Sequence, residues 1–364
     1  MADVIHFKCP GCGGPLEFDP KSGEIVCTYC GNRYSEEEIR RLSEEKQAEA
    51  DKARAEESRE KSGSGAEGEN SGAASGAFKS YHCQNCGAEI VTEATTAATR
   101  CYYCHSPVVL SDRLSDEYHP DGVIPFKLDR DKALELFKKY VSKKWFIDRA
   151  FFAEAALDDF TGVYYPYWIG DFKGDAVYDG EGKIVTTHRS GNDIVTVTQY
   201  YRLHREGRLT FRSMIRKALG KTDRQLSDGI HPYEQTDMQP FASGYLSGFL
   251  AEKRDVEEED AKSDMIEETR GYVTGLMTQD TGLTGLHGKA SYTPRESRMR
   301  YVLLPTWLLT WTGGRKGVYY YMMNGQTGRV CGKLPLRRSK LLLWSLALMA
   351  LVAGLMCLGG VYIW

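Results

Sequence analysis

The feature that most limits what this chain can fold into is an apolar run near its C-terminus. Residues 341–364 read LLLWSLALMALVAGLMCLGGVYIW and carry no charge. A helix of this length spans about 36 Å, whereas the hydrocarbon core of a bilayer is about 30 Å thick. Trp344 at one end, with Tyr362 and Trp364 at the other, suits the two membrane interfaces. The run therefore predicts a transmembrane helix over 341–364 and argues against a buried core helix.

The residues before this run predict its orientation. Lys333, Arg337, Arg338 and Lys340 precede it with no acidic residue among them. The positive-inside rule places such a flank in the cytoplasm. The N-terminus, MADVIHFKCP, has no apolar segment of the kind found in signal peptides. We expect a tail-anchored, single-pass protein of the cell (inner) membrane, with the lipid bilayer as a partner and the N-terminal body in the cytoplasm.

Most of the ten cysteines fall into four Cys-x-x-Cys pairs, arranged as two sets with the same internal spacing. The first set is Cys9, Cys12, Cys27 and Cys30, and the second is Cys83, Cys86, Cys101 and Cys104. Two such pairs can place four thiolates around one tetrahedral Zn²⁺. Cys9-Pro-Gly-Cys12 also resembles a redox dithiol, but the repeated spacing favours metal. We predict two Zn²⁺ ions, one in each four-cysteine ribbon.

These ribbons are expected to be structural elements, each with a small sheet between its cysteine pairs. The apolar residues expected in these sheets are Leu16, Phe18 and Val26 in ribbon 1, and Ile90 and Val91 in ribbon 2. Four thiolates close the zinc coordination shell and leave no position for a substrate. Gly13, Gly31 and Gly87 follow knuckle cysteines, where a positive φ is often required. Basic and acidic residues are nearly balanced around both ribbons, and the net charge of the chain is −3. This balance argues against nucleic acid as a partner, because a nucleic-acid surface requires clustered Lys and Arg.

A charged spacer and a linker separate the two ribbons. Ser35 and Glu38 form a capping-box pattern that opens a solvated helix over 35–61. Residues 62–77, SGSGAEGENSGAASGA, have the composition of a flexible linker. We therefore expect ribbon 1 (1–34) to move freely relative to everything behind it, including ribbon 2 (78–110).

The body, residues 118–336, alternates helix and strand signals. Asp129 is expected to cap a helix, and Asp255 with Glu258 to open a longer one ending near Met277. A further helical stretch is predicted over 241–250. Turns are expected at 179–182 and at Glu206-Gly207. The strands predicted around them are 123–127, 163–168, 176–178, 184–187, 193–203, 209–214, 301–312 and 318–323, with Asn324-Gly325 as the last turn.

One sequence repetition suggests an internal duplication of the body. Tyr164–Ile169 (YYPYWI) resembles Leu303–Leu308 (LLPTWL), and an extended segment follows each. Because a proline inside a strand belongs at an edge or a bulge, the body would hold two related sheet units with helices between them. The fold class is therefore α+β: two zinc ribbons, a mixed body with antiparallel hairpins, and one C-terminal transmembrane helix at 341–364.

The order of these motifs resembles a known bacterial family. The two ribbons, the segment 123–129 (VIPFKLD), the two Pro-x-Trp strands, the segment 323–328 (MNGQTG) and the terminal span are together similar to the TFIIB-type zinc ribbon-containing membrane proteins. Some of these carry a label as primosomal replication-factor-Y-like helicases. The resemblance covers nearly the whole chain. It implies a single-pass membrane protein associated with phage-shock-type envelope-stress proteins and SPFH-like scaffold proteins.

A helicase or ATPase activity does not follow from the residues. Gly220-Lys221-Thr222 is the nearest match to a phosphate-binding loop, and Ile215 stands where its first glycine should be. His188, His204 and His231 are scattered, and no nucleophile or paired-carboxylate motif is evident. We expect no enzyme, although sequence spacing leaves open a catalytic cluster within residues 118–336.

Two hypotheses for the function follow. The first is a tail-anchored, zinc-binding adaptor that recruits cytoplasmic or membrane-associated proteins to the inner face of the membrane. The resemblance implies that it does so in envelope stress, with phage-shock-type and SPFH-like proteins as partners. A homo-oligomer would also fit this role. The alternative is a membrane-tethered zinc-ribbon protein that binds nucleic acid in replication or transcription.

Overall fold

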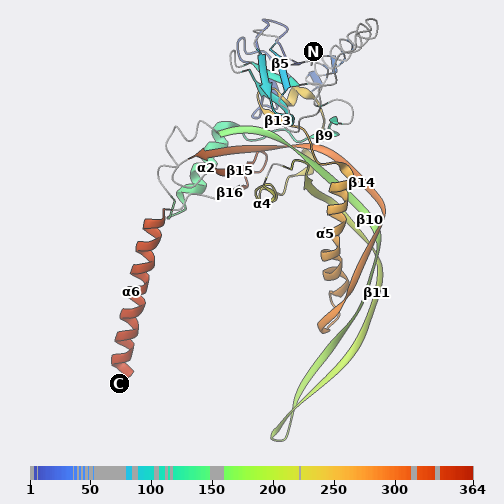
Figure 1. Ribbon diagram of the computed structural model, residues 1–364, viewed down its shortest axis with the longest axis vertical. Coiled ribbons are helices and arrows are strands. Elements are labelled where there is room, and N and C mark those ends of the chain that lie inside the picture. The colour runs from blue at the N-terminus through green and yellow to red at the C-terminus, as the bar shows by residue number, and fades with distance from the viewer. Residues whose placement is uncertain are drawn as a thin grey trace, which may run out of the picture.

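The structure is a computed structural model of the chain. It describes residues 4–5, 7–35, seven positions within 37–52, 79–83, 89–101, 106–110, 114, 118–147, 160–220, 223–312, 318–332 and 337–363. A long curved sheet joins a cysteine-rich end near the N-terminus to a C-terminal helix (Figure 1). The body is a mixed α+β fold, as expected from the sequence.

Three very long strands form the centre of the main sheet. They are β10 (Phe160–Ser190), β11 (Asp193–Lys217) and β14 (Thr284–Thr312). β10 lies between the other two and pairs antiparallel with both. At about 3.3 Å per residue, β10 is about 100 Å long. Pairing with β14 ends at Lys183–Thr284, so beyond that point β10 and β11 continue as a two-stranded ribbon.

Both turns predicted inside these strands are wrong. The strand runs through Gly180 and Gly182, and the hairpin turn lies at Gly191, where φ is +64°. Gly180 faces Gly288 of β14 in register. A Cβ on Gly288 would lie 2.4 Å from the Asp179 carbonyl oxygen, so glycine here allows two backbones to approach closely. Gly207 lies within β11 and pairs with Ala176 of β10, so the strand does not turn there either.

Shorter strands complete the main sheet. On the body side they are β9 (Gly122–Val123), β12 (Gln239–Pro240), β13 (Leu250–Glu252), β15 (Val318–Asn324) and β16 (Val330–Gly332). On the ribbon side they are β1 (Val4–Ile5), β7 (Thr96–Arg100) and β8 (Pro107–Leu110). The strand predicted over 123–127 is thus reduced to β9. No strand is predicted from the sequence over 284–300, the first part of β14.

Two units of the body repeat one arrangement. On β14, parallel β9 pairs with Val302 and Leu303, and antiparallel β15 begins at Thr306. On β10, parallel β13 pairs with Val163 and Tyr164, and antiparallel β11 begins at Tyr167. Each changeover brackets a proline, Pro305 in one strand and Pro166 in the other. A proline, which has no N–H to donate, is tolerated at such a gap in the ladder.

The indole hydrogen bonds follow the same repeat. Trp307 Nε1 donates to the Leu128 carbonyl at 3.1 Å, and Trp168 Nε1 donates to the Val256 carbonyl at 3.0 Å. Leu128 and Val256 each precede, by two residues, the first residue of a helix that follows a short parallel strand. β10 and β14 pair with each other so that a local two-fold axis relates the two units. Common descent of the units stays a prediction.

Two of the predicted body helices form as expected. α2 (Arg130–Ser142) begins after Asp129, whose carboxylate accepts the Lys132 N–H at 2.7 Å. α5 (Glu258–Thr278) buries every fourth residue against β14 and β10, as helical periodicity requires. That stripe is Ala261, Met265, Thr269, Val273 and Met277. Its N-cap is Glu257 and not Asp255.

The helix predicted over 241–250 is largely absent. Only η5 (Ser243–Leu246), a short 3₁₀ turn, forms between β12 and β13. There are two other short helices, α4 (Arg224–Gly229) and η4 (Gln235–Asp237). They lie beside a smaller cluster of buried hydrophobic residues that is separate from the main core. Tyr245 and Phe249 of the segment 241–250 are buried because they pack on Phe18 of ribbon 1 and on Phe126, not because they form a helix face.

Ribbon 1 has its own small sheet, and the second cysteine region shares strands with the body. Ribbon 1 consists of β2 (Leu16–Asp19), β3 (Glu24–Cys27) and β4 (Arg33–Tyr34). β5 (Lys79–His82) pairs with β6 (Glu89–Thr92). β7 then pairs with β13, and β8 pairs with β1. Both ends of the cysteine-rich region are therefore hydrogen-bonded into the main sheet.

The expectation that ribbon 1 moves freely relative to the rest is wrong for the described residues. Its core residues Leu16 and Phe18 belong to the same buried cluster as Tyr245 and Leu246 of the body. The capping box between Ser35 and Glu38 forms, with the Ser35 N–H donating to the Glu38 carboxylate at 2.7 Å. Most of the helix predicted at 35–61 and the whole linker at 62–77 lie outside the described residues.

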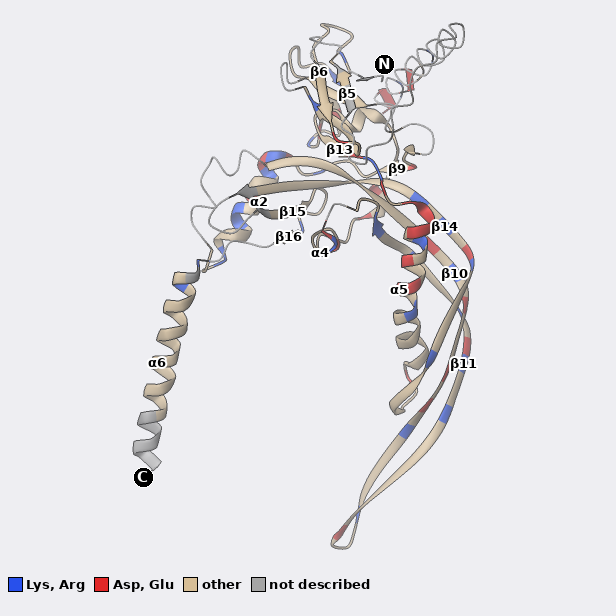
Figure 2. Ribbon diagram, viewed as in Figure 1, with Lys and Arg blue, Asp and Glu red and all other residues tan. Residues whose placement is uncertain are grey.

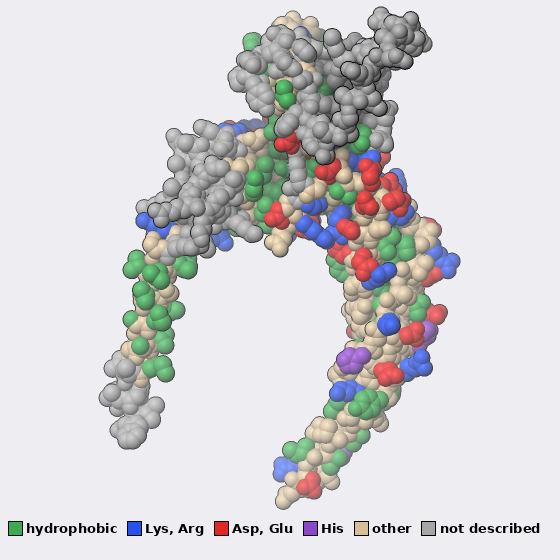
Figure 3. Space-filling model, viewed as in Figure 1, with side chains coloured by type: hydrophobic (Ala, Val, Ile, Leu, Met, Phe, Trp, Pro, Cys, Tyr) green, Lys and Arg blue, Asp and Glu red, His purple; other side chains and the backbone are tan. Residues whose placement is uncertain are grey.

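The last element is α6 (Arg338–Ile363), which covers most of the predicted span. It is long and apolar enough to cross a membrane, and Ser339–Met356 within it is not buried against the rest of the protein. Figure 3 shows apolar side chains exposed along the coloured part of this helix. The helix is consistent with a single-pass membrane protein.

Candidate metal centre

Ribbon 1 brings its four cysteine sulfurs to one point. Cys9 and Cys12 come from the loop before β2, and Cys27 and Cys30 from the end of β3 and the turn after it. All four Sγ atoms lie within 4.8 Å of one another. The Cys9–Cys30 and Cys12–Cys27 sulfur pairs are 3.6 and 3.5 Å apart. Gly13 and Gly31, with φ of +71° and +73°, turn the chain after Cys12 and Cys30, as predicted.

This cluster fits a tetrahedral zinc ion. With Zn–S bonds of about 2.3 Å, sulfurs at the corners of a tetrahedron lie about 3.8 Å apart. The observed pairs approach that spacing, and the donor set is entirely thiolate. Cys9, Cys12, Cys27 and Cys30 would hold the ion, which supplies folding energy to a ribbon too small to have a large core of its own. Four protein ligands complete the shell, so the site has no position for a substrate.

The groups around the sulfurs shift the pKa values of the cysteine thiols in different directions. The Tyr34 hydroxyl lies 3.3 Å from Cys9 Sγ and, as the largest cause, lowers the pKa of Cys9 to about 6. The backbone N–H of Asn32 acts to lower the pKa of Cys30. The neighbouring sulfurs and burial outweigh it and raise this pKa to about 12. Four thiolates repel one another at this distance, so a cation is needed to hold all four deprotonated.

Tyr34 and Asn32 were not singled out from the sequence. Tyr34 lies on β4, and Asn32 Nδ2 lies 3.9 Å from Cys9 Sγ. The signal available was the run Cys30-Gly31-Asn32-Arg33-Tyr34, in which a small polar residue and a phenol follow the last knuckle. Ile25 is another omission: it is completely buried, whereas the predicted core residue Val26 is only half-buried.

The second set of cysteines is partly described. Cys83 and Cys101 are buried, with Tyr81, Ile90, Val108 and Leu110 around them. Val91, predicted in the ribbon interior, is exposed. Cys86, Cys104 and Gly87 lie outside the described residues. Zinc at this set therefore stays a prediction.

Ribbon 1 is docked through both backbone and side chains. The Phe18 N–H donates to the Ser247 carbonyl at 3.0 Å, and the Ser247 hydroxyl donates to the Leu16 carbonyl. The Phe18 ring meets Tyr245 edge-on, with centroids 5.4 Å apart. One of the metal ligands, Cys27, lies on β3, the strand that pairs with the docking strand β2. Zinc in ribbon 1 would thus stabilise the docking of the ribbon as well as its fold.

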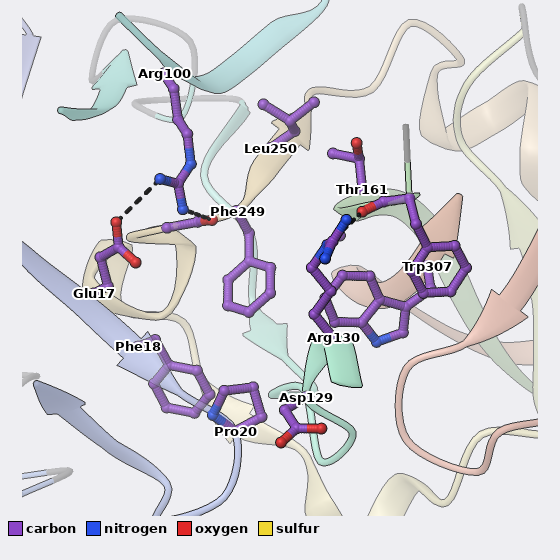
Figure 4. Close-up of a pocket in the computed structure, with 13 residues that line it drawn as sticks. Glu17, Phe18, Pro20, Arg100, Asp129, Arg130, Thr161, Phe249, Leu250 and Trp307 are labelled. Atoms are coloured by element: carbon purple, nitrogen blue, oxygen red, sulfur yellow. Dashed lines mark hydrogen bonds and ion pairs between the residues drawn. The ribbon is translucent and has the colours of Figure 1, made fainter. Parts of the chain in front are cut away.

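An open cavity of about 480 Å³ lies at this junction (Figure 4). Phe18, Phe249 and Trp307 provide apolar walls. The charged side chains that line the cavity are paired with neighbouring residues. Arg100 contacts the Glu17 carboxylate at 3.1 Å and donates to the Gly248 carbonyl at 2.8 Å. Asp129 is paired with Lys21 at 2.5 Å. Around the cavity, these ion pairs join ribbon 1 to β7 through Arg100 and to the body through Asp129.

The structure does not bring together the three histidines considered above. His188 is exposed on the β10–β11 ribbon. His204 contacts Asp179 at 2.6 Å and Glu206 at 3.1 Å, and these two carboxylates raise its pKa. His231 packs against the rings of Tyr167 and Tyr233, and burial lowers its pKa.

The described geometry defines a zinc-ribbon protein with an α+β body and one candidate membrane helix. The TFIIB zinc-binding family model matches residues 7–47, which contain the four-cysteine cluster. Over 343 residues the chain is 28% identical to "Uncharacterized protein YdjG" of Bacillus subtilis (strain 168). That similarity covers 94% of this chain and 93% of the relative, so it includes the body. No solved structure matches.

Proposed function

We propose that this protein is a membrane-held, zinc-binding adaptor that recruits a protein partner to the inner face of the cell membrane. The observation that carries the proposal is the β10–β11 ribbon, here called the arm and defined as residues 170–214. The arm extends away from the rest of the body (Figure 1). Its outer part, residues 184–199, pairs with no third strand among the described residues.

The outer arm exposes side chains that favour strand contacts. Ile194 is 75% exposed, and other β-branched residues are exposed beside it. Tyr200, which borders this outer part on the body side, is 79% exposed. An isolated two-stranded ribbon is marginally stable in water, and a long exposed edge is a template for another strand. A partner segment that added to the free edge of β11 would satisfy its backbone groups and cover these side chains.

The other parts of the protein suit the same role. α6 would hold the body at the membrane, with its basic N-terminal flank in the cytoplasm. The closed cysteine site of ribbon 1 serves structure, and its docking fixes the cysteine-rich end to the sheet that bears the arm. Phage-shock-type and SPFH-like proteins, which the family resemblance implies, are the first partners to test, and envelope stress is the process in which to look.

Shortening the arm tests this proposal. Lys183 and Tyr200 face each other across the arm, so residues 184–199 can be replaced by an Asn-Gly turn without disturbing the pairing above them. The full chain and this variant are crosslinked in cells and purified from membranes. We expect specific proteins on the full chain and their loss from the variant. A Tyr272→Ser variant, which alters an exposed residue of α5, should keep them. Equal recovery with the shortened arm would refute the role of the arm.

A further inference from the structure

The C-terminal end of α2 has an unusual surface for a soluble body. Trp145, just after the helix, is 74% exposed. Lys138, Lys139, Lys143 and Lys144 are exposed around it. The opposite face of α2 is buried through Ala133, Phe137 and Val141. An exposed indole among lysines matches the composition of membrane-interface segments, where the ring lies at the headgroup level and the lysines meet lipid phosphates.

This surface is joined to the beginning of α6. The Arg337 N–H donates to the Phe146 carbonyl at 2.8 Å. The Trp145 and Trp344 rings lie 6.2 Å apart. Two segments about 190 residues apart in sequence therefore meet where the apolar helix leaves the body. The contact places Trp145 beside Trp344, the residue predicted from the sequence to lie at the membrane interface.

Among the described residues, the charges at this junction are basic (Figure 2). Arg337 and Lys340 come from the beginning of α6, Lys138 and Lys139 from α2, and Lys143 and Lys144 from the residues just after α2. The acidic residues of α2, Asp131 and Glu135, lie nearer its N-terminal end, and Glu135 is paired with Lys132 at 2.7 Å. Lys144 lies over the Tyr140 ring, with its Nζ 5.0 Å from the centroid, so it leans along the helix surface.

We propose that residues 138–146, which comprise the end of α2 and the segment after it, form a docking surface for the anionic headgroups of the bilayer together with the beginning of α6. The inference rests on the proposed membrane role of α6 and adds a second, body-borne contact with lipid. Trp145 lies at the interface beside Trp344, and the lysines contact lipid phosphates. The body is thereby held in one orientation on the membrane, which a single helix would not achieve alone.

The test uses the full chain in vesicles of phosphatidylcholine, with and without phosphatidylglycerol. A photo-reactive benzoylphenylalanine replaces Trp145, Met349 or Tyr272 in separate variants, and lipid adducts are detected by mass spectrometry. Met349 is an exposed residue of α6, and Tyr272 is an exposed residue of α5. We expect adducts at 145 and 349 but not at 272. Phosphatidylglycerol should raise the yield at 145, and adding Lys143→Glu with Lys144→Glu should remove that increase.

The outcomes separate the two proposals. Adducts at 349 without adducts at 145 would overturn the docking surface and leave the membrane anchor intact. No adduct at 349 would overturn the anchor, and with it the basis of the docking surface. Adducts at 145 that do not respond to phosphatidylglycerol would contradict the role of the lysines.

Discussion

At the scale of residues, the cysteines have the most definite consequences. If both sets bind metal, the purified chain holds two Zn²⁺ ions. Cys9→Ser removes one ligand of the described site, so its zinc content should fall to one ion. Cys83→Ser should likewise leave one ion, because the second set would lose a ligand. Metal analysis by mass spectrometry measures these numbers, and a native chain with one ion would contradict the second site.

Loss of zinc from ribbon 1 should also loosen its docking on the body. β2 contacts Ser247 and Tyr245 and pairs with β3, which bears Cys27. Cys9→Ser should therefore increase hydrogen exchange at Leu16, Phe18 and Ser247 but not along α5. A matched control is Cys331→Ser, which changes a cysteine outside both sets. Unchanged exchange in β2 would show that docking does not depend on the metal.

His204 provides a prediction about pH. Hydrogen bonds with Asp179, then with Glu206, raise its pKa above the ordinary value of about 6.5. A raised pKa stabilises the folded state below the unfolded-state pKa, and this contribution is lost as the pH rises through the folded-state value. NMR titration should give a pKa above 6.5 in the native chain and a lower one in Asp179→Asn. Equal values in the two proteins would contradict the pairing.

At the scale of elements, the paired tryptophans test the repeated arrangement. Trp168→Phe and Trp307→Phe each remove an N–H donor from a carbonyl next to a helix N-terminus. Each should lower the free energy of unfolding by about 1–2 kcal/mol, because a carbonyl loses its partner. Trp145→Phe, at an exposed position, should change it little. Denaturant unfolding in detergent measures all three, and no loss in the first two would show that these bonds contribute little.

The elements also show how far the sequence could predict the fold. The cysteine ligands, the Asp129 cap, α5 and α6 follow from local spacing, and they form as expected. Gly180 and Gly207 were interpreted as turns because glycine is also a turn residue. In the structure Gly180 allows close approach to β14, a partner more than 100 residues away in sequence. Local patterns do not contain such non-local reasons for a glycine.

The docking of ribbon 1 was missed for a similar reason. The linker composition at 62–77 indicates flexibility of that segment, but it does not determine whether the domains on either side touch. Phe18 reads as ribbon core from the sequence, and only its contact with Tyr245 shows that it also faces the body. The docking includes the hydrogen bonds that Ser247 makes with Leu16 and Phe18, and no spacing rule predicts these bonds.

At the scale of the whole molecule, the arm and α6 extend from the same side of the body (Figure 1). The arm bears charged pairs, such as Arg208 with Asp175 at 3.9 Å. Charged side chains are costly in hydrocarbon, so the arm must stay in water. When α6 crosses a bilayer, the arm must therefore point in a different direction from α6 and remain in water.

This divergence can be tested by cysteine labelling in inside-out membrane vesicles. Asn192→Cys, at the tip of the arm, should react with a membrane-impermeant maleimide well above the level of the parent chain. Met349→Cys, within α6, should not. Protection of position 192 that disappears in detergent would indicate that the arm enters the membrane, contrary to this account.

The most direct test of the adaptor role is site-specific crosslinking from the edge of the arm in living cells. A photo-reactive residue replaces Tyr200, which is 79% exposed on β11, in the full chain. The account predicts a discrete protein adduct in the membrane fraction, and none when the same residue replaces Tyr272 on α5. If irradiation yields no protein adduct at 200, or yields nucleic acid in its place, the claim that this protein recruits a protein partner through its arm is wrong.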